Sequence, residues 1–272
     1  MPVTFTAVGD VMLDLGLTSG SEPHDAVIQS TVGGTAVNAA VWAAEAGAEA
    51  TCVGRVGIDA GALAVRGALA ARGVAAALAA DPGERTGAVA FVDGDLLVDR
   101  GANRRLSPAD LRALDADAVL VSGYVLLHED SGPAGRAALR GGARWTGVTA
   151  GSVDLVRRRG LAALVGARVL VANAAEARAL TGAEPEEAVR ALAGAHELAC
   201  VTLGPDGALL AHGGDLFRAT SPSIAGLAHG GAGDAFAATL LVALAAGAAP
   251  ADALETACRA GSAAAGSADG WP

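Results

Sequence analysis

Two kinds of sequence pattern alternate along the whole chain, and this alternation limits the fold more than any other feature. Short runs rich in β-branched residues are followed by Ala/Leu-rich segments that begin at Ser, Thr, Asn or Asp and end at Gly. Parallel strands covered by helices have this pattern, because both faces of each strand are buried. The chain is therefore predicted to be an α/β protein with a doubly wound, mostly parallel sheet and helices on both faces. We expect strands at 4–8, 50–53, 118–122, 144–148, 168–172 and 199–203, and helices at 35–46, 60–71, 108–114, 153–165, 174–180, 187–193, 234–246 and 251–265.

Two segments, 10–30 and 85–103, interrupt this alternation. Both look like strands joined by hairpins, and the second carries an Asp93-Gly94 turn between strands expected at 88–92 and 96–99. Neither has the helical segment that would cover a parallel strand. We therefore expect one domain, 1–272, with a small β-sheet lid formed by about 10–32 and 85–104. The lid should cover the C-terminal ends of the strands, where open α/β sheets bind ligands.

The charge of the chain argues against a polyanionic partner. The formal net charge is −10, so we expect no nucleic acid partner and no membrane association. The apolar stretches are shorter than the ~20 residues of a membrane-spanning helix. Cys52, Cys200 and Cys258 lie far apart in apolar runs, which indicates buried free thiols and a reducing compartment. A cytoplasmic enzyme is the expected class.

The basic residues exclude several catalytic mechanisms. All 19 of them are arginine, so the chain has no lysine for a Walker-type phosphate loop, a pyridoxal Schiff base or a lysine nucleophile. Any phosphate group must therefore be held by backbone amides, arginine or a metal ion.

The sharpest motif is the GGAGDAF sequence at 230–236, directly before an apolar helical run. Small residues allow a tight turn that points several amide N–H groups into one concavity, and the helix N-terminus adds partial positive charge. The motif predicts a binding site for a phosphoryl group. Asp234 at its mouth is either a base that accepts a proton from a hydroxyl nucleophile or a cap of the helix. A dinucleotide-binding fingerprint would need glycine in place of Phe236 and a strand directly before the loop.

A second glycine pair also precedes a helix, in the sequence GGTAVN at 33–38. An amide at Asn38, in the first helical turn, could bind sugar hydroxyls, and the glycines would let a ligand approach the main chain. Alternatively, Thr35 is an ordinary N-cap and Asn38 is solvated. Asp14 ends an apolar run, where its carboxylate is either a ligand for two hydroxyl groups of a polyol or a turn residue.

The order of these motifs is more specific than any one of them. From about residue 8 to residue 264, the chain resembles the ribokinase-like (PfkB) family of carbohydrate kinases. The matching segments are Gly9 with Asp14, GGTAVN at 33–38, GRVGID at 54–59 with Gly61, GAN at 101–103, Asn173 with Glu176, TLG at 202–204 with Gly207, and GAGD at 231–234.

This resemblance implies an ATP- and Mg²⁺-dependent kinase that phosphorylates a hydroxyl group of a small sugar or related polyol. We expect this hydroxyl group to be a primary one. It implies that Asp234 is the catalytic base and that Gly231, Ala232 and Gly233 form the anion hole. The acceptor would be bound by Asp14, Gly33, Gly34, Asn38 and Asn103. The nucleotide would be bound by Asn173, Glu176, Thr202, Gly204 and Gly207, and Glu176 would bind Mg²⁺ through water. A homodimer formed through the lid is also expected.

Two departures from the family pattern qualify this function. Ala228 stands where the family commonly has an aspartate that helps to hold a monovalent cation, so we expect little activation by potassium. Thr149 replaces an acidic strand end. A nucleoside kinase of the same fold remains an alternative, although aromatic residues make up only 3% of the chain. A sugar- or nucleotide-binding sensor without turnover is the other alternative.

Overall fold

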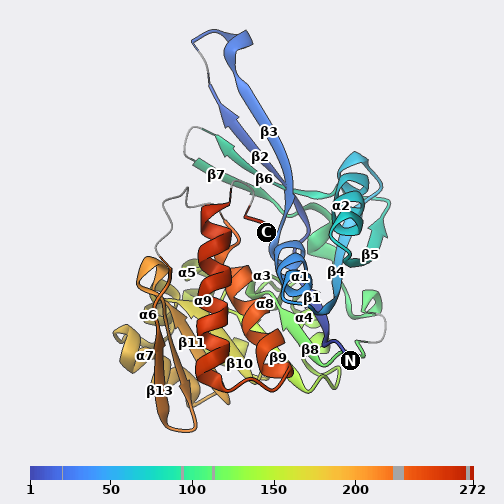
Figure 1. The fold of residues 1–272 in the computed structure, drawn as a ribbon. Helices are drawn as coiled ribbons and strands as arrows, with labels where there is room; N and C mark the ends of the chain where they lie inside the picture. Colours follow the sequence, from blue (N-terminus) through green and yellow to red (C-terminus); the bar gives the residue numbers. More distant parts are fainter. Residues whose placement is uncertain (20, 93–94, 112–113, 223–229, 268–269) are drawn as a thin grey trace.

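A nine-stranded sheet forms the centre of the molecule (Figure 1). In this computed structural model, which describes residues 1–272 except 20, 93–94, 112–113, 223–229 and 268–269, the strand order is β13-β12-β11-β10-β9-β8-β1-β4-β5. In this order, all strands from β11 to the edge strand β5 run parallel. Strands β12 and β13 are added antiparallel at the other edge. The strands are β1 (Thr4–Val8), β4 (Glu49–Gly57), β5 (Ala75–Asp81), β8 (Ala118–Val121), β9 (Trp145–Thr149), β10 (Val169–Asn173), β11 (Leu198–Thr202), β12 (Ala208–His212) and β13 (Asp215–Ala219).

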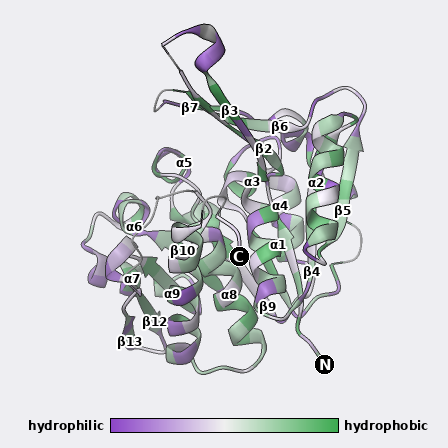
Figure 2. Cartoon of the chain, turned by 45° about the horizontal axis from the view of Figure 1, so that its top comes forward, coloured by the Kyte–Doolittle hydropathy of each residue, from purple (hydrophilic) through white to green (hydrophobic). Residues whose placement is uncertain are grey.

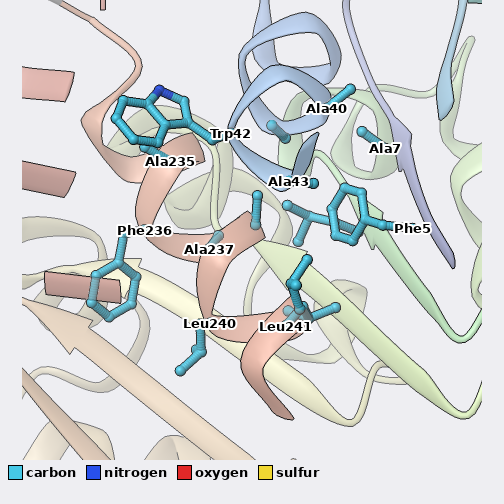
Figure 3. Close-up of a cluster of buried hydrophobic side chains, with 14 of the residues drawn as sticks. Phe5, Ala7, Ala40, Trp42, Ala43, Ala235, Phe236, Ala237, Leu240 and Leu241 are labelled. Carbon is cyan, nitrogen blue, oxygen red and sulfur yellow. The ribbon is translucent and has the colours of Figure 1, made fainter. Parts of the chain in front are cut away.

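Helices cover both faces of this sheet, and each face has its own buried cluster of apolar side chains. Figure 3 shows part of the first cluster, where Phe5 of β1 lies near Leu241. This face carries α1 (Thr35–Glu45), α2 (Ala60–Ala71), α8 (Ala232–Ala245) and α9 (Pro250–Gly266). The opposite face carries α3 (Gly123–Leu127), α4 (Gly132–Leu139), α5 (Val153–Arg159), α6 (Ala174–Thr181) and α7 (Pro185–Ala193).

The central strands are apolar on both faces because both faces are covered. All four residues of β8 are buried, as are four of the five residues in each of β1, β10 and β11. Truncation of one such side chain, for example Leu170→Ala, typically costs about 2–5 kcal/mol of stability. The continuous apolar runs in the sequence predicted this burial.

Helix α8 lies unusually close to the middle of the sheet. A Cβ atom at Gly147 of β9 would lie only 2.6 Å from Cδ1 of Leu241, so this approach requires glycine on the strand. The close packing brings α8 directly over the central strands and fixes where its first turn lies.

A second, four-stranded sheet projects from one end of the main body (Figure 1). Its order is β3-β2-β6-β7, with an antiparallel hairpin in each half and a parallel contact between β2 and β6. Several large apolar side chains on it are exposed, including Ile28, Leu96 and Leu97. Figure 2 shows hydrophobic stretches on this sheet, for example along β3. We call it the small sheet. Its strands are β2 (Met12–Thr18), β3 (Val27–Gly33), β6 (Gly87–Val92) and β7 (Asp95–Asp99).

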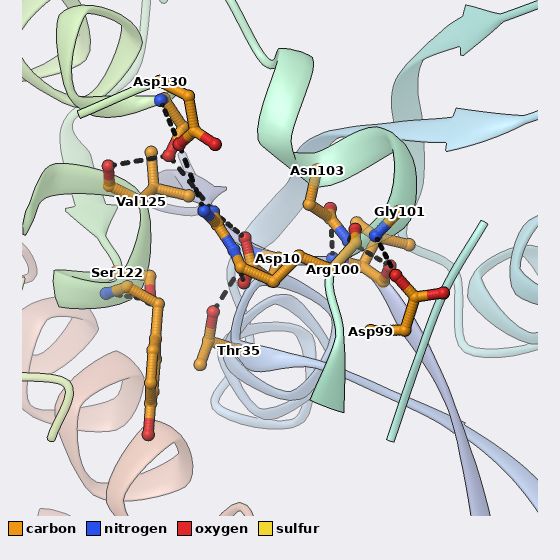
Figure 4. Close-up of polar contacts among 12 residues, drawn as sticks. Asp10, Thr35, Asp99, Arg100, Gly101, Asn103, Ser122, Val125 and Asp130 are labelled. Atoms are coloured by element: carbon orange, nitrogen blue, oxygen red, sulfur yellow. Dashed lines mark hydrogen bonds and ion pairs between the residues drawn. The ribbon is translucent and has the colours of Figure 1, made fainter. Parts of the chain in front are cut away.

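One buried ion pair ties together two of the segments that connect the small sheet to the main body (Figure 4). Asp10 lies between β1 and β2, and Arg100 follows β7. The guanidinium donates to both carboxylate oxygens, at 3.0 and 2.9 Å, and also to Ser131 and Asp130. Loss of either partner would leave the other buried without its counter-charge, which typically costs about 3–5 kcal/mol.

The predicted fold class is confirmed, and the differences from the sequence prediction are local. Strands β5, β12 and β13 and helices α3 and α4 were not predicted. The helix expected at 153–165 is interrupted at Gly160, whose φ is +70°, and continues as a short 3-10 helix (Leu161–Leu164). The helix expected at 108–114 is only a short 3-10 helix (Pro108–Asp110), because the chain leaves helical geometry at Leu111. Residues 112–113 and the expected Asp93-Gly94 turn lie outside the described residues. No described helix combines the length and apolar character that crossing a bilayer requires.

Candidate active site

The C-terminal ends of three adjacent parallel strands open into one polar cavity of about 230 Å³. Thr149, Asn173 and Thr202 come from the ends of β9, β10 and β11. The first turn of α8 closes the opposite side with Gly231, Gly233 and Asp234, and the wall is completed by Thr35, Tyr124, Gly151, Val171, Ala172 and Glu176. Residues widely separated in sequence therefore meet where an open α/β sheet binds ligands.

The start of α8 provides unshielded backbone donors in this cavity. Gly231 precedes the helix with a φ of +99°, a conformation that favours glycine. A Cβ atom at Gly233 would have no other described atom within 4 Å, and no described side chain caps the helix. Free N–H groups and the helix dipole make this turn suited to an anion.

Asp234, in the same turn, is a carboxyl group with a high proton affinity. Its pKa is raised from 3.8 to about 7, mainly by burial and also by the negative charges of Asp14 and Glu176, while a hydrogen bond from Asn38 acts in the opposite direction. Asn38 Nδ2 donates to Asp234 Oδ2 at 3.1 Å. A carboxyl group with a pKa near neutrality can exchange a proton with a ligand hydroxyl group.

Asp14 approaches the same region from the small sheet. Its carboxyl group lies against Gly33 of β3, where a Cβ atom would be 2.2 Å from Asp14 Oδ2, so only glycine leaves room for it. Burial raises the pKa of Asp14 to about 6. The next residue, Gly34, has a φ of +92° and turns the chain into α1, which carries Asn38. Asp14, Gly33, Gly34 and Asn38 are therefore brought together.

Asn103 is part of the connection to the small sheet. Its side chain is only 1% exposed, and its amide bonds to main-chain groups. Asn103 Oδ1 accepts from Val11 N at 2.9 Å, while Nδ2 donates to the carbonyl groups of Val11 and Arg100. In this arrangement Asn103 joins the segment before β2 to the segment after β7, and its predicted contact with the acceptor stays a prediction.

Asn173 and Glu176 form a reciprocal cap at the start of α6. Asn173 Oδ1 accepts from Glu176 N, and Glu176 Oε2 accepts from Asn173 N, both at 2.9 Å. Burial raises the pKa of Glu176, and both residues line the polar cavity. The cap fixes the direction of the carboxylate and does not remove it from the cavity.

A wider cavity of about 440 Å³ adjoins the polar one. The two share Thr202 and Gly233, so they open on either side of the α8 N-terminus. The wider cavity contains the predicted residues Gly204 and Gly207. Its other lining residues are mostly small or apolar: Pro205, Ser221, Pro222, Ala232, Phe236, Cys258, Gly261, Ser262 and Ala265. It is therefore suited to a largely apolar group.

The comparison with protein families gives a match over nearly the whole chain: residues 4–270 match the model of the pfkB family carbohydrate kinases. The chain belongs to the PfkB family. The comparison with curated proteins found no match.

Solved structures of other kinases share the fold of this PfkB chain. Adenosine kinase from Sinorhizobium meliloti is 20% identical, with a TM-score of 0.88 over 100% of this chain and 96% of that one. A putative ribokinase II from E. coli, in complex with ATP and Mg²⁺, is 18% identical, with a TM-score of 0.84 over 98% and 94%. Arabidopsis thaliana ribokinase, with ribose and ATP, is 22% identical, with a TM-score of 0.81 over 100% and 96%.

The two departures from the PfkB pattern fall in different places. Thr149 lines the polar cavity, and its hydroxyl accepts a hydrogen bond from Gly123 N at 3.2 Å. Ala228 lies outside the described residues, so the expected weak activation by potassium stays a prediction. Among the described residues, no three His, Cys, Asp or Glu side chains are grouped as a metal site.

Sequence reasoning missed three features of this site. Tyr124 lines the polar cavity from α3, a helix that was not predicted. Trp271 Nε1 donates to Asn38 Oδ1 at 2.9 Å. The Asp10–Arg100 pair supports the strand that carries Asp14. A lone charged residue before a glycine motif was the only available signal for Arg100, and no local pattern points to Trp271.

Proposed function

We propose that the protein transfers the terminal phosphoryl group of ATP to a primary hydroxyl group of a small sugar or related polyol. The observation that carries this proposal is the position of Asp234. Its carboxyl group has a pKa of about 7 and lies in the first turn of α8, where two cavities meet. Membership in the PfkB family supports phosphotransfer.

In this function, Asp234 accepts the proton of the attacking hydroxyl group. The N–H groups at Gly231, Ala232 and Gly233 stabilise the negative charge on the transferred group through hydrogen bonds and the helix dipole. Because these donors are already oriented by the helix, little reorganisation is needed during the reaction. Asp234 would therefore activate the acceptor hydroxyl group directly beside the N–H groups that bind the transferred phosphoryl group.

The acceptor would occupy the side of the polar cavity nearest the small sheet. Asp14 can accept two hydroxyl hydrogen bonds, Asn38 can donate from its second amide hydrogen, and Gly33 and Gly34 expose main chain. Asn103 would support this surface by holding Val11. We further propose that the chain acts as one catalytic unit in which the small sheet covers the acceptor.

The nucleotide would occupy the wider cavity, with its phosphates directed past Thr202 and Gly204 towards Asn173. Gly207 supports the turn in this wall: its φ is +92°, and a Cβ atom there would lie 1.9 Å from Ala219 O. The ATP complexes of the E. coli and Arabidopsis proteins, which share this fold, support ATP as the donor.

Magnesium fits the oxygen groups on the cavity wall. Glu176 contributes one carboxylate, and Thr149 and Thr202 contribute hydroxyl groups; Mg²⁺ usually takes one or two carboxylates, the nucleotide phosphates and several waters. Bound with ATP, it would neutralise charge on the phosphates, with Glu176 holding one of its waters.

A nucleoside acceptor is the second candidate, and a specific cavity favours it. A space of about 250 Å³ is lined by Leu13, Ser30, Thr31, Val32, Ala64, Ala68 and Trp271. Thr31 pairs across strands with Asp14, and Trp271 bonds to Asn38, so this mostly apolar space borders the acceptor residues. It could take the base of a nucleoside next to a ribose held by Asp14.

The test is a phosphotransfer assay with labelled ATP and Mg²⁺ against pentoses, hexoses, polyols and purine ribosides. We expect label transfer to at least one sugar or polyol, and none with Asp234→Asn. Transfer to ribosides alone would establish the second candidate. Acceptor binding by calorimetry without transfer would identify a sensor and overturn the proposed function.

The expected homodimer is proposed to form through the small sheet. Ile28 and Leu97 lie on one face of this sheet and are 70% and 58% exposed, and burial of such a face favours association. Light scattering should give twice the monomer mass, and Leu97→Glu should reduce it. The cytoplasmic location stays a prediction.

A further inference from the structure

The last residues of the chain pack against the start of α1 and the loop before α8. Trp42 Nε1, on α1, donates to Gly270 O at 2.8 Å in a buried contact. Gly270 has a φ of +73°, and a Cβ atom there would lie 2.6 Å from Gly230 O. Figure 1 shows the C-terminus next to the upper end of α1, below the small sheet. This segment is therefore held between the two glycine-rich motifs.

Trp271 is positioned tightly within this segment. Its side chain is 9% exposed, and the guanidinium of Arg72 lies 5.4 Å from the centre of its ring. Arg72 also donates to the carbonyl oxygen of Pro272. The ring is thus held in place by two elements: α1, which bonds to the neighbouring Gly270, and the end of α2, where Arg72 lies over the ring.

The contact between Trp271 and Asn38 determines which way the Asn38 amide faces. An indole N–H can only donate, so it requires the carbonyl oxygen of the amide on its side. The amide nitrogen must then face Asp234, to which it donates at 3.1 Å. If the amide were reversed, Asn38 would present an oxygen to the carboxyl group and could bond only to its protonated form.

We propose that Trp271 is a positioning residue that holds the Asn38 amide in the orientation needed for phosphoryl transfer; this role rests on the proposed function. With the amide held, Asn38 donates one hydrogen to Asp234 and directs the other to the acceptor. Asp234 is then held as a hydrogen-bond acceptor, which is the state that a general base needs before it takes a proton. Trp271 acts only through Asn38.

The structural part of the proposal can be tested without any substrate. The indole N–H signals of Trp42, Trp145 and Trp271 should be visible by NMR, and Trp271→Phe identifies the third by its loss. In Asn38→Ala, we expect the Trp271 signal to move upfield and to exchange with deuterium faster, while that of Trp145 is unchanged. An unmoved Trp271 signal would overturn the contact.

The catalytic part requires a double-mutant cycle with the best acceptor from the panel. Trp271→Phe should lower kcat/KM for the acceptor by about 3- to 10-fold, the value of one ordinary hydrogen bond, and leave the KM for ATP unchanged. In an Asn38→Ala background, the same substitution should have no further effect. Trp145→Phe is the matched control, because Trp145 Nε1 is buried without a hydrogen-bond partner among the described residues.

The outcomes separate this proposal from the proposed function. An equal loss from Trp271→Phe with and without the Asn38 amide, or a similar loss for ATP and acceptor, would show that Trp271 only stabilises the chain and would overturn its positioning role. Absence of transfer to every acceptor by the unaltered protein would overturn the proposed function and, with it, the catalytic role of Trp271. The NMR result would still decide whether Trp271 orients Asn38.

Discussion

The two glycine-rich helix starts, at α1 and at α8, have similar sequences but need glycine for different reasons. At α1, a Cβ atom would lie 2.2 Å from Asp14 Oδ2 at Gly33 and 2.4 Å from Asp10 O at Gly34. At α8, Gly233 faces open space among the described residues. The first motif has glycine because the protein itself fills the space, whereas in the second Gly231 is required by its φ of +99° and a Cβ atom at Gly233 would meet no described atom. One sequence signal therefore has two physical causes.

The largest effect should come from the one acid in the open motif. We expect Asp234→Asn to lower kcat by ~10²–10⁴-fold, because the amide cannot take the hydroxyl proton. Nucleotide affinity, measured by calorimetry, should change little. A variant with nearly normal kcat would show that Asp234 is not the catalytic base, and the contrast between the two motifs would lose its functional meaning.

In the filled motif, we expect Gly34→Ala to destabilise the fold. Its φ of +92° is unfavourable for alanine, and the added Cβ would collide with the main chain at Asp10. The loss should exceed about 2 kcal/mol in the free energy of unfolding, measured with urea. A loss below 0.5 kcal/mol would contradict the claim that this motif is packed to its limit.

In the open motif, Gly233→Ala should have the opposite profile. Gly233 lies within the first turn of α8, where alanine is a better helix former, so stability should stay equal or rise by up to ~1 kcal/mol. Turnover should still fall, by about 10-fold or more, because the methyl group would occupy the space beside the anion-binding N–H groups. Normal turnover would mean that the transferred group binds elsewhere.

The last expected effect is a dependence of stability on pH. Burial raises the pKa of Asp234 to about 7 and that of Asp14 to about 6, both from 3.8, so the folded state binds protons more tightly than the unfolded state. The free energy of unfolding should therefore fall as the pH rises from about 4 to 7. Urea unfolding at pH 5 and pH 8 measures this, and Asp234→Asn should reduce the difference. An unchanged difference in that variant would mean that Asp234 is not the group responsible.

Much of the fold could be predicted from local patterns. Helix α2 has the predicted bounds, 60–71, because Asp59 is a local N-cap and accepts a hydrogen bond from Ala62 N. Strand β5 was missed because its AAALAAD sequence has little β-propensity and is held by pairing with β4. Strands β12 and β13 were also missed. They extend the sheet edge as an antiparallel hairpin, which breaks the strand–helix alternation on which the prediction was based.

The site was predictable where its signals are local. Glycine loops before helices predicted the positions of Asp234 and Asn38, but their mutual contact joins residues 196 positions apart. The Trp271 contact spans 233 positions, and the Asp10–Arg100 pair spans 90. Such contacts depend on how whole elements pack, so periodicity and spacing carry no information about them.

The ion pair between Asp10 and Arg100 also limits how the small sheet can move. The pair joins one connection of each hairpin at a buried point, so the two hairpins cannot move independently without separating opposite charges in a low-dielectric interior. The parallel contact between β2 and β6 joins the two hairpins further out. The two hairpins of the small sheet should therefore move together, and any such movement would change the distance between Asp14 and Asp234.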